Sequence, residues 1–258
     1  MSSVLFLDFD GVLHADAVYC VGGPPYGHVG QPFEFAGRLA DVLDEHPGVA
    51  IVFSTSWQYQ ESTEALSAYL PERLRVRVRG GTADDVAQEY LDSKKTGWMG
   101  TFSRTPGAVS FHDRQSLAEG WMQAYRPGVP WLSLDDDTFR FGYRCPRLLH
   151  CQGGFLEPEA ALLQAWLVAP GRDMQEIVRE HAPADPADWT VRDATAAVPY
   201  RDGVPVLDGL PEVLRVAVLR LMPELTTGYW QALLANWGRT RRGPLLMDKD
   251  EAGRECLP

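Results

Sequence analysis

An apolar run that ends in two carboxylates is the feature that most constrains this chain. Residues 4–7 are apolar, and Asp8, Asp10 and Gly11 follow directly. Apolar residues on both faces predict a buried strand of a parallel sheet, and such sheets bind ligands at the carboxyl ends of their strands. Side chains two apart share a face, so one carboxylate can attack while the other handles the proton. The pattern predicts a phosphoryl-transfer site, although a strand ending in a polar Asp-Gly turn would look the same.

Composition limits the classes of protein that the chain can represent. Its 258 residues suit one large domain, or one domain with a small companion, and a hydrophobic content of 45% with eight Trp argues against disorder. A formal charge of −11 disfavours a broadly basic nucleic-acid coat but leaves room for a local basic groove. We expect no signal peptide and no membrane span, a cytoplasmic location, and reduced thiols at the four sparse cysteines.

Beyond the first strand, short apolar segments alternate with segments of helical periodicity. We expect strands at residues 49–53, 73–79, 131–134 and 148–151, and helices at residues 35–45, 62–70, 83–91, 113–125 and 157–168. This order predicts an α/β fold with a doubly wound, Rossmann-like parallel sheet. The Gly-, Pro- and Tyr-rich residues 14–31 are too few for a cap domain, so they predict a small flap over the strand ends.

Pro170 and Gly171 form the best candidate for a domain boundary. We expect residues 1–170 to form the α/β core and residues 171–258 to form a small, mainly helical domain. Its expected helices are residues 174–181, 211–221 and 227–237. The sequence leaves three roles open for this domain, namely a cap over the site, dimerisation, or partner binding.

A hydroxyl-rich segment follows the second predicted strand. Ser54 comes directly after residues 49–53, so its hydroxyl should lie at the same sheet edge as Asp8 and could hold a phosphate oxygen. Thr55 and Ser56 are alternatives for this role. A Ser-Thr-Ser segment also commonly caps the start of a helix.

A second strand ends in acids. Residues 131–134 are mostly apolar and lead into Asp135, Asp136 and Asp137. Clustered carboxylates repel one another unless a cation joins them, and Mg²⁺ is an oxygen-seeking ion that bridges carboxylates to phosphate. Asp135 and Asp136 are therefore candidate Mg²⁺ ligands, whereas Asp137 could cap a turn. A solvated acidic turn is the alternative interpretation of all three.

These stretches, in this order, resemble the haloacid dehalogenase (HAD) superfamily of aspartate-nucleophile phosphotransferases. The finer resemblance is to the compact HAD domain of Swiss-army-knife RNA repair proteins, and it covers about residues 1–169. The matching segments are residues 7–13, 54–57, 105–106, 114, 134–136 and 154–155. The sequence departs from the pattern at Gln58, where Arg is usual, and at Phe155, where Leu is usual.

The resemblance implies a role for each matching residue. Asp8 would be the nucleophile and Asp10 the general acid and base. Mg²⁺ would be held by Asp8, the Asp10 backbone carbonyl, and Asp135 or Asp136. Ser54, Thr55, Gly11 and Arg114 would bind the phosphoryl group. Arg114 would replace the usual Lys of the third motif, because Lys94 and Lys95 lie further upstream.

Two functions remain open from the sequence. The first is a Mg²⁺-dependent phosphomonoester hydrolase that acts on nucleic-acid terminal phosphates or on nucleotides. The resemblance implies this, because HAD cores with little cap admit large substrates and the second aspartate of the motif favours phosphate esters over carbon–halogen bonds. The second is a binding or regulatory module, in which the C-terminal domain recognises a protein or nucleic-acid partner and the HAD core is weakly active or a scaffold. The alternating arginines of residues 73–79 could follow a phosphodiester backbone or guard an edge strand.

Overall fold

The computed structural model describes residues 2–15, 18–19, 26–27, 30–83, 114–141, 144–201, 204–207 and 209–222. The chain divides into two compact units, Met1–His181 and Ala182–Pro258. Several sequence expectations lie outside the described residues. They are the helix at 227–237, the helix at 83–91 beyond its first residue, the lysines at 94 and 95, and the Thr-Pro pair at 105–106.

The first unit is built on a five-stranded parallel sheet with the order β5-β4-β1-β6-β7. The strands are β1 (Ser3–Leu7), β4 (Val49–Phe53), β5 (Val78–Gly81), β6 (Trp131–Asp135) and β7 (Leu148–His150). The first strand of the sequence lies in the middle of the sheet, with later strands added on both sides. This confirms the predicted doubly wound α/β core.

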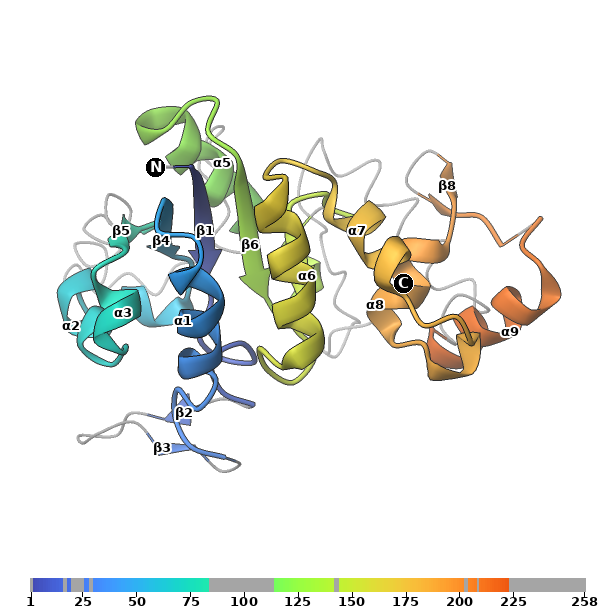
Figure 1. The fold of residues 1–258 in the computed structure, drawn as a ribbon, viewed down its shortest axis with the longest axis horizontal. Helices are drawn as coiled ribbons and strands as arrows, with labels where there is room; N and C mark the ends of the chain where they lie inside the picture. Colours follow the sequence, from blue (N-terminus) through green and yellow to red (C-terminus); the bar gives the residue numbers. More distant parts are fainter. Residues whose placement is uncertain are drawn as a thin grey trace, which may run out of the picture. The chain divides into compact units, whose positions relative to one another are not determined.

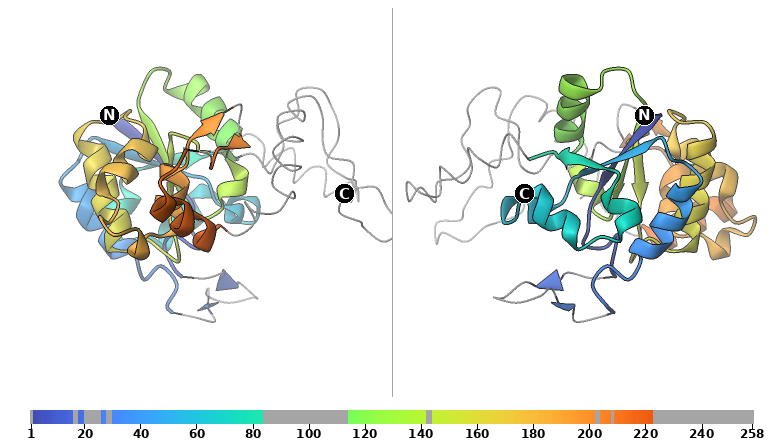
Figure 2. Two further views of the ribbon diagram at one scale, coloured as in Figure 1. Left: turned by 90° about the vertical axis from the view of Figure 1, so that its right-hand side faces the viewer. Right: turned by 60° about the vertical axis from the view of Figure 1, so that its left-hand side comes forward.

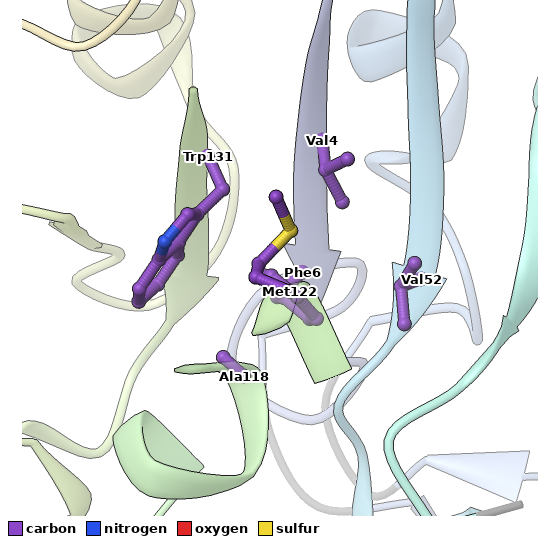
Figure 3. Packing of buried hydrophobic residues seen from close by; sticks show 6 residues of the cluster. All are labelled: Val4, Phe6, Val52, Ala118, Met122 and Trp131. Carbon is purple, nitrogen blue, oxygen red and sulfur yellow. The ribbon is translucent and has the colours of Figure 1, made fainter. Parts of the chain in front are cut away.

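Helices cover both faces of the sheet (Figures 1 and 2). Helices α1 (Ala36–Asp44) and α6 (Glu157–Val168) pack against each other on one face, and α5 (Arg114–Tyr125) covers the other. Strand side chains alternate between the two faces. Those under α5 form a buried cluster with it (Figure 3): Val4, Phe6, Val52, Ala118, Met122 and Trp131.

Shorter elements complete the first unit. They are the hairpin β2 (Val18–Tyr19) and β3 (Tyr26–Gly27), the 3₁₀ helices η1 (Ser56–Tyr59) and η2 (Thr138–Arg140), and the helices α2 (Thr63–Ala68), α3 (Glu72–Arg75) and α7 (Met174–His181). The hairpin falls within the segment expected to be a flap. Helix α7 packs against α6. The position of a domain boundary near residue 170 stays a prediction.

The described part of the second unit is mainly helical. It contains η3 (Pro186–Asp188), α8 (Val191–Ala197), the hairpin β8 (Tyr200–Arg201) and β9 (Val204–Pro205), and α9 (Glu212–Leu221). Helices α8 and α9 share a small buried cluster, which comprises Ala194, Val198, Val218 and Met222. None of the helices in the described ranges is long and apolar enough to cross a bilayer.

The strand predicted at residues 73–79 is wrong over its first half. Residues Glu72–Arg75 form helix α3, and β5 begins only at Val78. Arg73 lies on the helix and contacts Asp41 and Asp44 of α1 at 2.7 Å. Alternating apolar residues therefore do not produce a row of arginines on one strand face here. Neither alternative for that row, a track for a phosphodiester backbone or a charged guard on an edge strand, is formed over residues 73–79 as a whole.

Arg77 instead closes the end of α1. Its guanidinium donates hydrogen bonds to the carbonyls of Leu43 at 2.8 Å and His46 at 3.0 Å. Carbonyls at the end of a helix have no partner inside the helix, so a donor at this position is stabilising, and the Arg77 side chain is only 11% exposed.

We expect Arg77→Gln to lower the free energy of unfolding by about 1–3 kcal/mol, because buried carbonyls lose their donors. The matched control is Arg79→Gln on the same segment, since Arg79 is exposed and its hydrogen bonds within the described residues go to the nearby carbonyls of Val76 and Val78. That control should change stability by less than about 0.5 kcal/mol. Urea unfolding followed by circular dichroism measures both, and equal losses would contradict the account.

Candidate active site

The strand register brings three polar residues to one edge of the sheet. Leu7 is aligned with Leu134, and the Asp8 amide donates to the Leu134 carbonyl at 3.1 Å. On the other side, the Ser54 amide donates to the Leu7 carbonyl at 2.8 Å. Asp8, Ser54 and Asp135 therefore emerge side by side at the carboxyl ends of β1, β4 and β6, as the sequence predicts.

A buried guanidinium lies between two buried carboxylates. Arg114 is the first residue of α5, and its Nη1 donates to Oδ2 of Asp8 and, at 2.5 Å, to Oδ2 of Asp135. The three residues are only 8%, 2% and 1% exposed, respectively. The structure thus brings the expected basic residue together with two of the expected acids, from three separate elements.

Burial dominates the electrostatics of this cluster. Desolvation raises the pKa of Asp8 and raises the pKa of Asp135 further, and the Arg114 charge offsets only part of each shift. Burial alone would lower the pKa of Arg114, but the two carboxylates outweigh it and raise that pKa above its usual value. Partial desolvation and the nearby Asp8 charge raise the pKa of Asp136 to about 6. When all three acids are ionised, their negative charge exceeds the single positive charge of Arg114, and burial makes this state costly.

The donor set fits a small divalent cation. One carboxylate oxygen from each of Asp8, Asp135 and Asp136 lies within 4.8 Å of the others. The Oδ1 atom of Asp8 is buried and has no hydrogen-bond partner in the described part of the chain. A buried carboxylate oxygen without a partner is costly, and oxygen-only ligands suit Mg²⁺. The residues present therefore fit the metal that the sequence predicts.

Asp10 is held by a different set of residues. Trp57 Nε1 donates to its Oδ2 at 2.9 Å, and His14 Nε2 lies 3.0 Å from its Oδ1. Sequence reasoning missed both partners. His14 lies close to Asp10 in sequence and Trp57 ends a matched motif, but neither fact reveals the shared contact.

The acids face a cavity of about 530 Å³. Its lining comprises Asp8, Asp10, Ser56, Arg114, Asp136, Asp137, Thr138, Arg140 and His150. Ser56, which was only an alternative candidate for phosphate binding, lines this cavity, whereas Ser54 and Thr55 line a small adjoining one. Thr55 also caps η1, because its Oγ1 accepts a hydrogen bond from the Trp57 amide at 3.4 Å. Arg140 and His150 were missed because no sequence pattern links them to the motifs.

Glycines permit the close approaches around the site. Gly11 has a φ of +67°, and a Cβ there would collide with the carboxylate of Asp136. Gly154 has a φ of +131°, and a Cβ there would collide with the ring of Phe35. Phe155 then donates its amide to the Val12 carbonyl at 2.7 Å, which joins the late Gly-Phe motif to the loop that carries Asp10.

Gln58 has a structural contact at the position where the resembling family usually has Arg. Its amide nitrogen donates to Thr82 Oγ1 at 3.0 Å, and its amide oxygen accepts from the Ala83 backbone at 2.9 Å. The side chain is buried and ties η1 to the segment after β5.

We expect the metal-free protein to become less stable as the pH rises through about 6, because the folded state binds the Asp136 proton more tightly than the unfolded chain does. Asp136→Asn removes this loss. In EDTA, the variant should unfold at a higher temperature than wild type by on the order of a degree or two at about pH 8, and the gain should shrink at about pH 4.5. Scanning calorimetry measures the unfolding temperatures of both proteins. A difference between variant and wild type that is larger at about pH 4.5 than at about pH 8 would contradict this assignment.

Comparison with known proteins agrees with this geometry. The family model described as the HAD domain in Swiss Army Knife RNA repair proteins matches residues 4–160, which is more than half of the chain. No curated protein and no solved structure gives a significant match. The matched residues contain the five-stranded sheet except for Ser3, the first residue of β1, and every acid of the site. The chain therefore belongs to the family of HAD domains found in Swiss Army Knife RNA repair proteins.

Proposed function

We propose that the protein is a Mg²⁺-dependent phosphomonoester hydrolase that works through an aspartyl-phosphate on Asp8. The observation that carries the proposal is the convergence of Asp8, Arg114 and the Asp135–Asp136 pair at the carboxyl edge of the sheet, beside a cavity that Asp10 also lines. Membership of an HAD family supports hydrolase chemistry. When bound, Mg²⁺ would supply positive charge to the phosphoryl oxygens, with Asp8, Asp135, Asp136 and the Asp10 backbone carbonyl as its protein ligands.

The chain's own residues account for the bonds that form and break. In the first step, a carboxylate oxygen of Asp8 attacks phosphorus as the ester P–O bond breaks, and Asp10 gives its proton to the departing oxygen. In the second step, Asp10 takes a proton from water, the water oxygen attacks phosphorus, and the Asp8–phosphorus bond breaks. Arg114 balances charge between nucleophile and phosphoryl group, and the hydroxyl groups of residues 54–56, together with the backbone at Gly11, orient that group.

The cavity supports a substrate with more than one anionic group. Beyond the acids, its wall carries Arg140 and His150. Arg140 Nε contacts Asp137 at 2.7 Å, which fixes the guanidinium at the cavity. A fixed guanidinium suits a second phosphate, so nucleic-acid ends or nucleotides are the proposed substrates. The described RNA-repair context of the family supports the same class.

The direct test is phosphate release from 3′- and 5′-phosphorylated oligonucleotides, mononucleotides and small phosphate esters, with Mg²⁺ or with EDTA. Wild type should release phosphate only with Mg²⁺, and Asp8→Asn should lower kcat by about 10³-fold or more because the nucleophile is lost. The matched control is Asp41→Asn, an exposed acid on α1 that should keep full activity. Absence of wild-type turnover on every substrate would reject the proposal in favour of a binding module.

Arg140→Gln tests the substrate class separately. We expect it to raise KM about tenfold for a phosphorylated oligonucleotide, the size expected for a charge-assisted contact, and to leave KM for a small monophosphate ester unchanged. Steady-state kinetics measures KM of wild type and variant for both substrates. An equal change for both would assign Arg140 to the structure of η2 and not to substrate selection.

A further inference from the structure

Two N–H donors converge on the carboxyl group of Asp10, one on each oxygen. Trp57 Nε1 is 2.9 Å from Oδ2 and His14 Nε2 is 3.0 Å from Oδ1. Two contacts on opposite oxygens fix both the position of a carboxyl group and the plane in which it lies. Neither donor lines the cavity, so their effect on the reaction would pass through Asp10.

The backbone determines which nitrogen of His14 carries the proton. The Phe33 amide donates a hydrogen bond to His14 Nδ1 at 3.3 Å, so Nδ1 is an acceptor. In a neutral imidazole the proton then sits on Nε2, which faces Asp10. Phe33 adopts a left-handed backbone conformation, with a φ of +61°. A bulky residue rarely occupies this region without a structural or functional reason, and here it directs an N–H group at the buried imidazole.

An aromatic cluster holds both donors in place. His14 is 1% exposed and Trp57 is 8% exposed. The Phe33 ring packs edge-on against His14 with centroids 5.3 Å apart and against Trp57 at 5.8 Å, and it stacks on Tyr69 at 5.5 Å. Phe9 contacts Trp57 from the strand side at 5.7 Å. Interlocked rings leave few alternative rotamers, so the two N–H groups are preorganised.

We propose that His14 and Trp57 are positioning residues that aim the Asp10 carboxyl group for proton transfer to the departing oxygen. The inference rests on the proposed phosphatase function. Proton transfer depends on the distance and alignment of donor and acceptor, so a carboxyl group that can rotate loses rate without losing substrate affinity. His14 and Trp57 should therefore increase the rate most for substrates whose departing oxygen must be protonated as it leaves.

The test compares kcat/KM for two substrates of different leaving groups. p-Nitrophenolate departs without a proton, whereas the alkoxide of an alkyl phosphate needs one. We expect His14→Leu and Trp57→Phe to lower kcat/KM for the alkyl phosphate about 10- to 100-fold, the usual range for an impaired general acid, and for p-nitrophenyl phosphate only a few-fold. Asp10→Ala should show the same selectivity with a larger loss.

A conservative variant separates positioning from packing. His14→Gln loses the ring nitrogen Nδ1 that accepts from the Phe33 amide, but its side-chain amide places an N–H donor near the position of Nε2. Much of the activity on the alkyl phosphate should therefore return relative to His14→Leu. Equal losses on both substrates in His14→Leu, with no recovery in His14→Gln, would overturn the proposal and leave a packing role.

The contacts of His14 and Trp57 with Asp10 can be tested by NMR even if the protein has no phosphatase activity. In ¹⁵N spectra of the full chain, His14 should be neutral with its proton on Nε2, and Asp10→Ala should shift the Trp57 indole N–H resonance. The variants His14→Gln and Trp57→Phe assign these signals. A proton on Nδ1, or an indole signal that ignores Asp10→Ala, would overturn the proposal even if wild type were inactive. The expected spectra from a wild-type protein without turnover would overturn the phosphatase function and the proton transfer, and would leave only the anchoring of Asp10 by His14 and Trp57.

Discussion

The site depends on one unfavourable arrangement, the burial of the Asp8 and Asp135 carboxylates at the end of a parallel sheet. Two such charges without a cation would repel each other in a medium that screens poorly. Arg114 contacts both and offsets part of the cost, yet the pKa of each carboxyl group remains raised. The need for a further cation, together with a buried Asp8 oxygen that has no partner in the described residues, is the physical case for a metal.

The fold supplies this arrangement through register and packing. Strands β1 and β6 pair so that Asp8 and Asp135 are neighbours, and α5 begins with Arg114 directly beside them. The helix is held over the sheet by the cluster around Phe6. Charge balance at the site and hydrophobic packing beneath α5 are therefore coupled, because movement of α5 would withdraw the guanidinium from the carboxylates.

The acids beside Arg114 and the acid Asp10 lie in different surroundings. Arg114 and the metal-compatible acids lie at the ends of β1 and β6, whereas Asp10 contacts His14 from the loop after β1 and Trp57 from η1, and an aromatic cluster holds both partners. Asp8 and Asp10 are two residues apart but have different environments, and a difference of this kind lets two carboxyl groups perform different steps.

The sequence predicts those parts that depend on local pattern. Apolar strands ending in acids located Asp8 and Asp135, and helical periodicity located α1, α5 and α6 within a few residues. Contacts between residues far apart in the chain could not be predicted from these local patterns. The alternation at residues 73–79 suggested a strand, but contacts of Arg73 with α1 accompany a helix there. The convergence of His14 and Trp57 on Asp10 joins residues 43 positions apart and required the folded chain.

The central claim is that Asp8 becomes covalently phosphorylated. Mixing the protein with a phosphorylated oligonucleotide and Mg²⁺, quenching in acid within milliseconds, and analysing the peptide that contains Asp8 by mass spectrometry tests it most directly. We expect a phosphate on Asp8 in wild type and none in Asp8→Asn. Phosphate release by wild type without any phosphorylated Asp8 peptide, under conditions where Asp10→Ala also accumulates none, would contradict it.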